Sequence, residues 1–84
     1  MDNAKIYVTY KESILDPQGE AIKTALHRLN YENVKAVTVG KYFEIKIEDH
    51  GQNIEEQVRK MSDELLANIN METYRFEISR IEED

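Results

Sequence analysis

Apolar and polar residues alternate over residues 5–11, where Ile6, Val8 and Tyr10 occupy every second position. A strand with one buried face shows this period of two, and β-branched and aromatic residues favour it. We therefore predict a strand over residues 5–11. Comparable segments rich in such residues predict three further strands, at residues 34–39, 42–48 and 73–79.

Two other segments repeat their apolar residues at a helical period. The first helix is predicted from Pro17 to Asn30, because Asp16 can cap its free amide groups and proline fits a first turn. Gly19 in that turn disfavours a helix, which indicates that some other group approaches the turn closely. The predicted inward-facing residues of this helix are Ala21, Ile22, Ala25, Leu26 and Leu29.

The second helix is predicted to begin after Asn53, which forms a capping-box pattern with Glu56, and to end near Ala67. Its predicted core stripe consists of Ile54, Val58, Met61, Leu65 and Leu66.

The short Gly40-Lys41 connection predicts a tight turn that joins residues 34–39 and 42–48 as an antiparallel hairpin. The element order is then β-α-β-β-α-β. It favours an α+β, two-layer, ferredoxin-like fold with a four-stranded antiparallel sheet and two helices on one face. Eighty-four residues make one such domain, which we place at residues 1–84.

This arrangement leaves one face of the sheet uncovered. A small domain with aromatic residues on an open face tends to self-associate, so we expect a dimer or a higher homo-oligomer. The residues predicted on this face are Tyr7, Thr9, Thr38, Tyr42, Glu44, Lys46, Arg75 and Glu77.

The composition of the chain excludes several kinds of site and argues against some partners. The chain has no cysteine, which excludes disulfides, thiolate metal sites and a cysteine nucleophile. The net charge is −6, and the acidic residues gather in the second half and in the tail Glu82-Glu83-Asp84, which argues against nucleic acid as a partner. No apolar run is long enough for a membrane span, and the N-terminus lacks a signal-peptide pattern, so we expect a cytoplasmic protein.

Candidate chemistry is sparse. His27 points off the apolar stripe of the first helix, and His50 follows Glu48 and Asp49 in a turn that has the composition of solvated loop residues. Nothing in the sequence predicts a nucleophile with a base, a phosphate loop or a metal-ligand set. The aromatic strand at Gly40–Ile45 resembles an RNA-binding strand, but its acidic surroundings disfavour that function. We therefore expect a non-catalytic interaction domain without a bound cofactor or metal.

Three blocks of sequence are similar to the small PurS-type subunit of the multi-subunit phosphoribosylformylglycinamidine synthase. They are Tyr7–Gly19, with Asp16-Pro17-Gln18-Gly19 at its end, Val37–Phe43, and the helix end Leu65–Asn68. Their order and spacing are those of the family over almost the whole chain. The chain departs from the family where Ile69-Asn70-Met71 replaces a common proline and apolar pair, which leaves the path there open.

The resemblance implies a role in de novo purine synthesis, where this enzyme converts formylglycinamide ribonucleotide to its amidine. It implies that partner subunits use ATP, Mg²⁺ and glutamine, and that this chain joins the large synthetase subunit to the glutaminase subunit. The family motifs that lie at turns make the following residues candidates for partner contact: Asp16, Pro17, Gly19, Gly40, Lys41 and Tyr42. The plainer interpretation is that these residues start a helix and close a hairpin.

Two other functions fit the same element order. A regulatory domain of the βαββαβ kind would bind a small molecule between subunits near Gly19. A small acyl-phosphate hydrolase is disfavoured, because the first loop lacks an arginine to hold phosphate.

Overall fold

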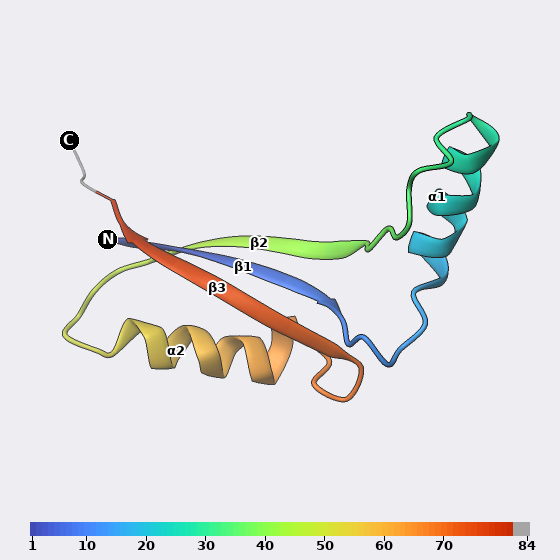
Figure 1. Cartoon of the computed structure of the whole chain (residues 1–84). Coiled ribbons are helices and arrows are strands. Elements are labelled where there is room, and N and C mark those ends of the chain that lie inside the picture. Colours follow the sequence, from blue (N-terminus) through green and yellow to red (C-terminus); the bar gives the residue numbers. More distant parts are fainter. Residues whose placement is uncertain (82–84) are drawn as a thin grey trace.

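The computed structural model describes residues 1–81 and contains one antiparallel sheet, two α-helices and a short π-helix (Figure 1). The elements are β1 (Asp2–Tyr10), α1 (Pro17–Arg28), β2 (Gly40–Ile47), α2 (Ile54–Met61), η1 (Ser62–Leu66) and β3 (Glu72–Arg80). The predicted α+β class, the antiparallel sheet and both helices are confirmed.

The sheet has the order β2-β1-β3, with β1 paired antiparallel to both neighbours. Ile6 lies opposite Phe43 on one side and Phe76 on the other, so apolar residues of all three strands share one face. Ala4, Ile6 and Val8 on this face are fully buried beneath α2, together with Val58 of that helix.

The second helix changes its winding before it ends. Ser62 begins the π-helical turn η1, and its hydroxyl donates to the Val58 carbonyl oxygen at 2.9 Å. A π turn adds a residue to the turn and so rotates the following side chains around the helix axis. Ser62, which lies four residues after Val58, is buried, whereas Leu65 within the π turn is 81% exposed. The prediction that Leu65 belongs to the core was wrong.

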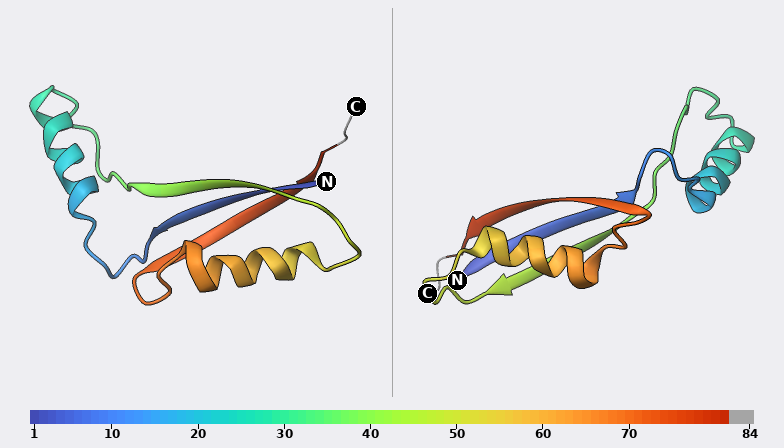
Figure 2. Two further views of the ribbon diagram at one scale, coloured as in Figure 1. Left: turned by 180° about the vertical axis from the view of Figure 1, so that it is seen from behind. Right: turned by 90° about the horizontal axis from the view of Figure 1, so that it is seen from below.

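The largest departure from expectation is an arm formed by residues 16–39, which contains α1 and the segment that returns to β2. Figures 1 and 2 show α1 standing beyond the end of the sheet in every view, away from the face that α2 covers. Residues 34–39 pair with no strand and run directly into β2 without a turn. The fourth strand, the hairpin at Gly40-Lys41 and the packing of the first helix on the sheet were therefore predicted wrongly.

The arm gives the chain an open shape. Its extents are 52 × 33 × 14 Å and its Cα radius of gyration is 16.7 Å, whereas a compact chain of this length has a radius of about 12 Å.

Within residues 1–81 no helix has the length and apolar character needed to cross a membrane.

Candidate functional site

At the base of the arm, the side chain of Asp16 connects the two segments of the chain that meet there. One carboxylate oxygen accepts from the Gly19 amide at 2.9 Å and caps α1, and the other accepts from the Val39 amide at 2.9 Å. One carboxylate thus joins the start of α1 to the end of the returning segment. These hydrogen bonds, with the one from Val39 contributing most, lower the pKa of Asp16.

Two glycines lie where backbones pass close together. A Cβ at Gly19 would collide with the carbonyl oxygen of Val37, which confirms the close approach predicted for this residue. A Cβ at Gly40 would lie 2.5 Å from the Val8 carbonyl oxygen. Gly40 is therefore required for close strand pairing, and the predicted tight turn at this position is absent.

At the tip of the arm, His27 connects the end of α1 to the segment that returns to β2. Its ring Nε2 lies 2.8 Å from the Val34 carbonyl oxygen, and since that oxygen can only accept, Nε2 donates. Asn30 follows the helix with a φ of 74°, a conformation that asparagine tolerates and that ends α1. Asp16 and His27 thus fasten α1 to residues 34–39 at both ends, and the arm is one unit.

Lys41 lies at the end of the sheet nearest the arm. Its Nζ is 3.3 Å from both carboxylate oxygens of Glu72 and 3.4 Å from the Leu66 carbonyl oxygen. Glu72 also accepts from the Asn68 amide at 2.8 Å, and this hydrogen bond, followed by Lys41, lowers the pKa of Glu72. Shallow hollows lined by Tyr10, Lys41 and Glu72 border the ion pair. The sequence did not single out Glu72, because its partners meet only when β3 lies beside the end of η1.

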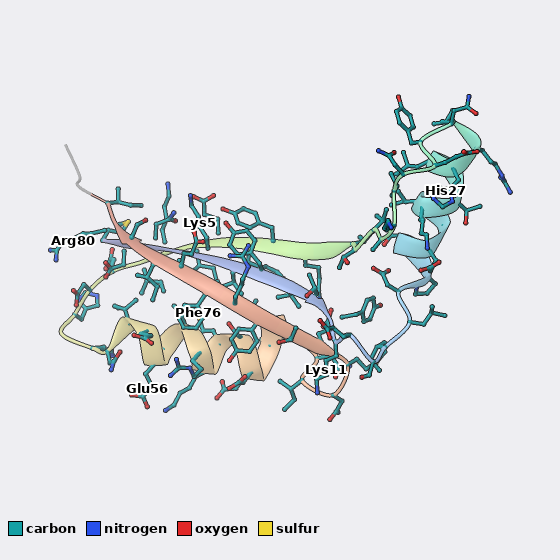
Figure 3. All side chains as sticks on the ribbon, viewed as in Figure 1. Lys5, Lys11, His27, Glu56, Phe76 and Arg80 are labelled. Atoms are coloured by element: carbon teal, nitrogen blue, oxygen red, sulfur yellow. The ribbon has the colours of Figure 1, made fainter. Side chains whose placement is uncertain are left out.

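The sheet face opposite α2 carries rows of polar and aromatic side chains. The Tyr7 ring lies tilted against the Tyr42 ring, with centroids 5.2 Å apart and an interplanar angle of 42°, and the Arg75 guanidinium lies 4.1 Å from the centre of the Tyr7 ring. Partial desolvation, followed by the carboxylate of Glu44, raises the pKa of Tyr42. Figure 3 shows Lys5 on this side of the sheet and Phe76 on the side of α2.

The strand register places most of the predicted open-face residues together, in cross-strand rows. One row is Tyr42-Tyr7-Arg75, the next is Glu44-Lys5-Glu77, and Thr9 lies in the row beside Tyr7. Thr38 is the exception, since residues 34–39 form no strand, and its predicted place on this face was wrong.

The predicted partner-contact residues separate into two groups. Asp16, Pro17 and Gly19 lie at the base of the arm, with Gly40 and Lys41 close beside them, whereas Tyr42 points to the open face. Asp16 caps α1 and Gly19 allows the close approach of Val37, so both have a structural role, in agreement with the interpretation that these residues start a helix. Contact of any of these residues with a partner stays a prediction.

The two histidines do not form a metal site within residues 1–81. His50 lies 3.2 Å from Glu48 on the exposed connection before α2, and no group of three potential ligands is found in this part of the chain. The His27 ring is engaged with the Val34 carbonyl oxygen at the tip of the arm.

Comparison with known proteins assigns the family. The family model described as PurS, phosphoribosylformylglycinamidine (FGAM) synthase, matches residues 3–80. The PurS subunit of Bacillus subtilis is 43% identical over 81 residues, which make up 96% of each protein. The PurS subunit of Synechocystis is 41% identical and covers 95% of this chain and 81% of its own length.

Solved structures agree with the sequence relatives. Bacillus subtilis PurS in a C2 crystal form superposes with a TM-score of 0.89 at 44% identity, over 95% of this chain and 100% of that one. A chain in the structure of PurLQS from Thermotoga maritima superposes with a TM-score of 0.72 at 26% identity, over 94% of this chain and 99% of that one. A match over nearly all of the described fold, arm included, shows that the chain belongs to the PurS family of phosphoribosylformylglycinamidine synthase.

Proposed function

We propose that this chain is the non-catalytic small subunit of a phosphoribosylformylglycinamidine synthase and joins its synthetase subunit to its glutaminase subunit. The observation that supports this most directly is the family match over residues 3–80, together with the likeness to a chain of the PurLQS structure. The enzyme would work in the cytoplasm on formylglycinamide ribonucleotide. The partner subunits, and not this chain, would bind ATP, Mg²⁺ and glutamine.

The contribution of the chain is positional. Ammonia reacts only in its unprotonated form and is lost once it reaches bulk water. A subunit that keeps the glutaminase and synthetase sites in register therefore raises the yield of transferred ammonia without supplying an acid or base. A thin molecule with an exposed arm and an exposed sheet face offers two surfaces for such bridging.

Self-association through the open sheet face belongs to the same proposal. The row that contains Arg75 has a net positive charge, and the neighbouring row of Glu44, Lys5 and Glu77 has a net negative charge. In a two-fold pairing of open faces, each row can lie against the other row of the second copy. The face is therefore electrostatically self-complementary.

A reconstitution tests the subunit role. The synthetase and glutaminase subunits are assayed for amidine formation with glutamine or with ammonium chloride, each with and without this chain. We expect glutamine-dependent activity to require the chain, and ammonia-dependent activity to change little. Turnover by the chain alone would contradict the proposal, and so would full glutamine-dependent activity without it. If neither activity nor complex size responds, thermal stabilisation of the isolated chain by amino acids or nucleotides would favour the regulatory-domain alternative.

A further inference from the structure

The outer edge of β3 lacks the features that usually protect an exposed sheet edge. Such edges are blunted by a proline, a lysine, a bulge or a short length. β3 is an outer strand of nine residues, none of which is proline or lysine. Its register against β1 runs without interruption from Glu72 to Arg80, so no bulge twists the edge away. In the part of the chain that the structure describes, Figure 2 shows no helix or strand along the outer side of β3.

The hydrogen bonds of β3 show which backbone groups point out from this edge. At one end of the ladder with β1, the Lys11 amide donates to the Met71 carbonyl oxygen at 2.9 Å. At the other end, the Ile81 amide donates to the Met1 carbonyl oxygen at 2.8 Å. Bonded and non-bonded pairs alternate in an antiparallel ladder, so the odd-numbered residues of β3 turn their N–H and C=O groups toward β1. The even-numbered residues turn theirs outward, and the central ones are Tyr74, Phe76 and Ile78.

The sequence of β3 is complementary to itself when it is read in the opposite direction. In an antiparallel pair of two such strands centred on Phe76, Arg75 of each copy lies opposite Glu77 of the other. These two residues form a non-hydrogen-bonded pair, in which side chains are closest. The remaining pairs join acid to base, hydroxyl to hydroxyl and aromatic to β-branched side chain: Glu72 with Arg80, Thr73 with Ser79, and Tyr74 with Ile78. Pairs of these kinds stabilise neighbouring strands.

The charges of β3 select this register over its neighbours. With the axis at Arg75, the two Arg75 guanidinium groups would lie opposite each other. With the axis at Glu77, two carboxylates would do so. Like charges directly opposite each other destabilise a strand pair. A shift by a single residue would bring the apolar side of one strand beside the polar side of the other. Only the register centred on Phe76 pairs unlike charges.

Helix α2 leaves room for this contact. Val58 is buried against Ile6 of β1, and the Arg59 guanidinium lies 5.7 Å from the centre of the Phe76 ring of β3. The helix therefore lies over the space between these two strands. Since neighbouring strands are about 4.8 Å apart, two such helices on a joined sheet lie about 10 Å apart, a usual distance for packed helices. Arg59 meets its counterpart at the axis, where the Glu55 carboxylate, 3.2 Å away, offsets its charge.

We propose that β3 pairs antiparallel with β3 of a second copy, about a two-fold axis at Phe76, so that the two sheets continue into one. The interface is isologous, because each strand presents the same residues to the other in reverse order. Both open sheet faces then lie on one side of the joined sheet, and both α2 helices on the other. The two arms stand at its opposite ends. This contact is distinct from a pairing of open faces, in which the two sheets would be stacked.

A cysteine in place of Arg59 tests this geometry, because the chain has no native cysteine. The Arg59→Cys chain is oxidised and separated by non-reducing electrophoresis. We expect a disulfide-linked dimer. Glu56→Cys, on the side of α2 that points away from the sheet in Figure 3, is the control and should stay unlinked. In a stack of open faces the α2 helices lie on the two outer sides, so neither variant would be linked. A failure of Arg59→Cys to link, or equal linking of both variants, would overturn the edge pairing.

Amide exchange measured by NMR gives a second test, which begins with the unmodified chain. In the joined sheet the Phe76 and Ile78 amides donate to the second copy, so we expect them to exchange about as slowly as the Glu77 amide, which is bonded to β1. In Arg75→Glu, like charges meet across the axis, and the two outward amides should exchange at least tenfold faster while the Glu77 amide changes little. Arg28→Glu makes the same charge reversal at an exposed position of α1 and should leave all three rates unchanged.

Two results of the exchange experiment would contradict the proposal. Fast exchange of the Phe76 and Ile78 amides in the parent would show that the edge of β3 is free. Equally slow exchange in the parent and in Arg75→Glu would show that the protection arises within one chain. Neither experiment uses a partner protein, so either result leaves the subunit role to its own test.

Discussion

Asp16 shows how one side chain can define a larger unit. Its carboxylate satisfies the first turn of α1 and the Val39 amide 23 positions later. Sequence alone indicates the first of these duties, because an Asp-Pro pair is typical of a helix start. The second duty depends on residues 34–39 passing beside that turn.

The Asp16→Asn variant separates the two hydrogen bonds. Its amide oxygen can still accept from Gly19 and cap α1, but its NH₂ group cannot accept from the Val39 amide. We expect a Tm several degrees lower at pH 7. The lowered pKa of Asp16 gives the sign of the pH dependence: the stabilisation is present above the unfolded-state pKa near 4 and disappears as the pH falls through the folded-state pKa. The difference in Tm between parent and variant should therefore shrink below about pH 4. Glu72 is present in both proteins, so its effect on Tm cancels in the comparison. An equal difference in Tm at pH 3 and pH 7 would therefore contradict the role assigned to Asp16.

Gly19 and Gly51 form a matched pair of glycines. Gly19→Ala places a methyl group against the Val37 carbonyl oxygen, so we expect the base of the arm to open and amide exchange at Val39 to accelerate. Gly51 has a φ of 82° and no atom within 4 Å of its virtual Cβ, and Gly51→Asn keeps a residue that tolerates this backbone. Hydrogen exchange followed by mass spectrometry compares the two. Equal protection of the arm in both variants would show that the close approach at Gly19 is unimportant.

At the scale of the element, η1 decides which side chains of the second helix are inside. A continued α-helix would keep Leu65 in line with Ile54, Val58 and Met61, as the spacing predicted. With the π turn, Leu65 is exposed, while Leu66 stays half-buried. The spacing of apolar residues does not reveal the π turn. Leu65 would face the core in a regular α-helix and Leu66 does so after a π turn, so the apolar pair is compatible with both.

Two substitutions measure this change of face. Leu65→Gln should alter the free energy of unfolding by less than about 0.5 kcal/mol, as is usual for an exposed position. Val58→Ala removes two methyl groups from a fully buried site and should cost about 2 kcal/mol. Urea denaturation at neutral pH gives both values. A larger loss for Leu65→Gln than for Val58→Ala would mean that Leu65 is covered, either by a partner copy or by a regular helix.

For the whole molecule, the two faces of the sheet have different chemistry and can serve different contacts. The face toward α2 contains the apolar core, and the opposite face carries alternating charged rows with two tyrosines. A substitution on the open face therefore probes assembly with little effect on the core.

Arg75→Glu reverses the charge of the row that contains Tyr7 and Tyr42. Since Arg75 is exposed and its distance to Glu77 is 3.4 Å, we expect a small change in Tm. Self-association through this face should weaken at least tenfold, because the reversed charge would meet Glu44 or Glu77 of the second copy. Ser79→Ala on the same strand is the control. Sedimentation over a concentration series measures both, and an unchanged association constant would remove the open face from the oligomer interface.

Most of the helices and strands could be predicted from the sequence, because the interactions that form them are local. The period of two in β1 and β3, the Asp-Pro start of α1 and the Asn53 cap of α2 depend on residues within one or two turns of each other. The rows on the open face followed from the same alternation. The family resemblance also came from the sequence, through motifs that lie mostly at the base of the arm.

The course of the arm and the roles of Gly19 and Gly40 follow from contacts between distant segments. Residues 34–39 have strand-forming composition, but a strand also needs a partner edge, and backbone pairing is a long-range interaction that no local pattern specifies. Gly40 is compatible with a turn and with a close strand crossing, and the neighbouring backbone of Val8 selects the second. The helix and strand preferences of this chain are therefore local properties, whereas the shape of the molecule depends on contacts between distant segments.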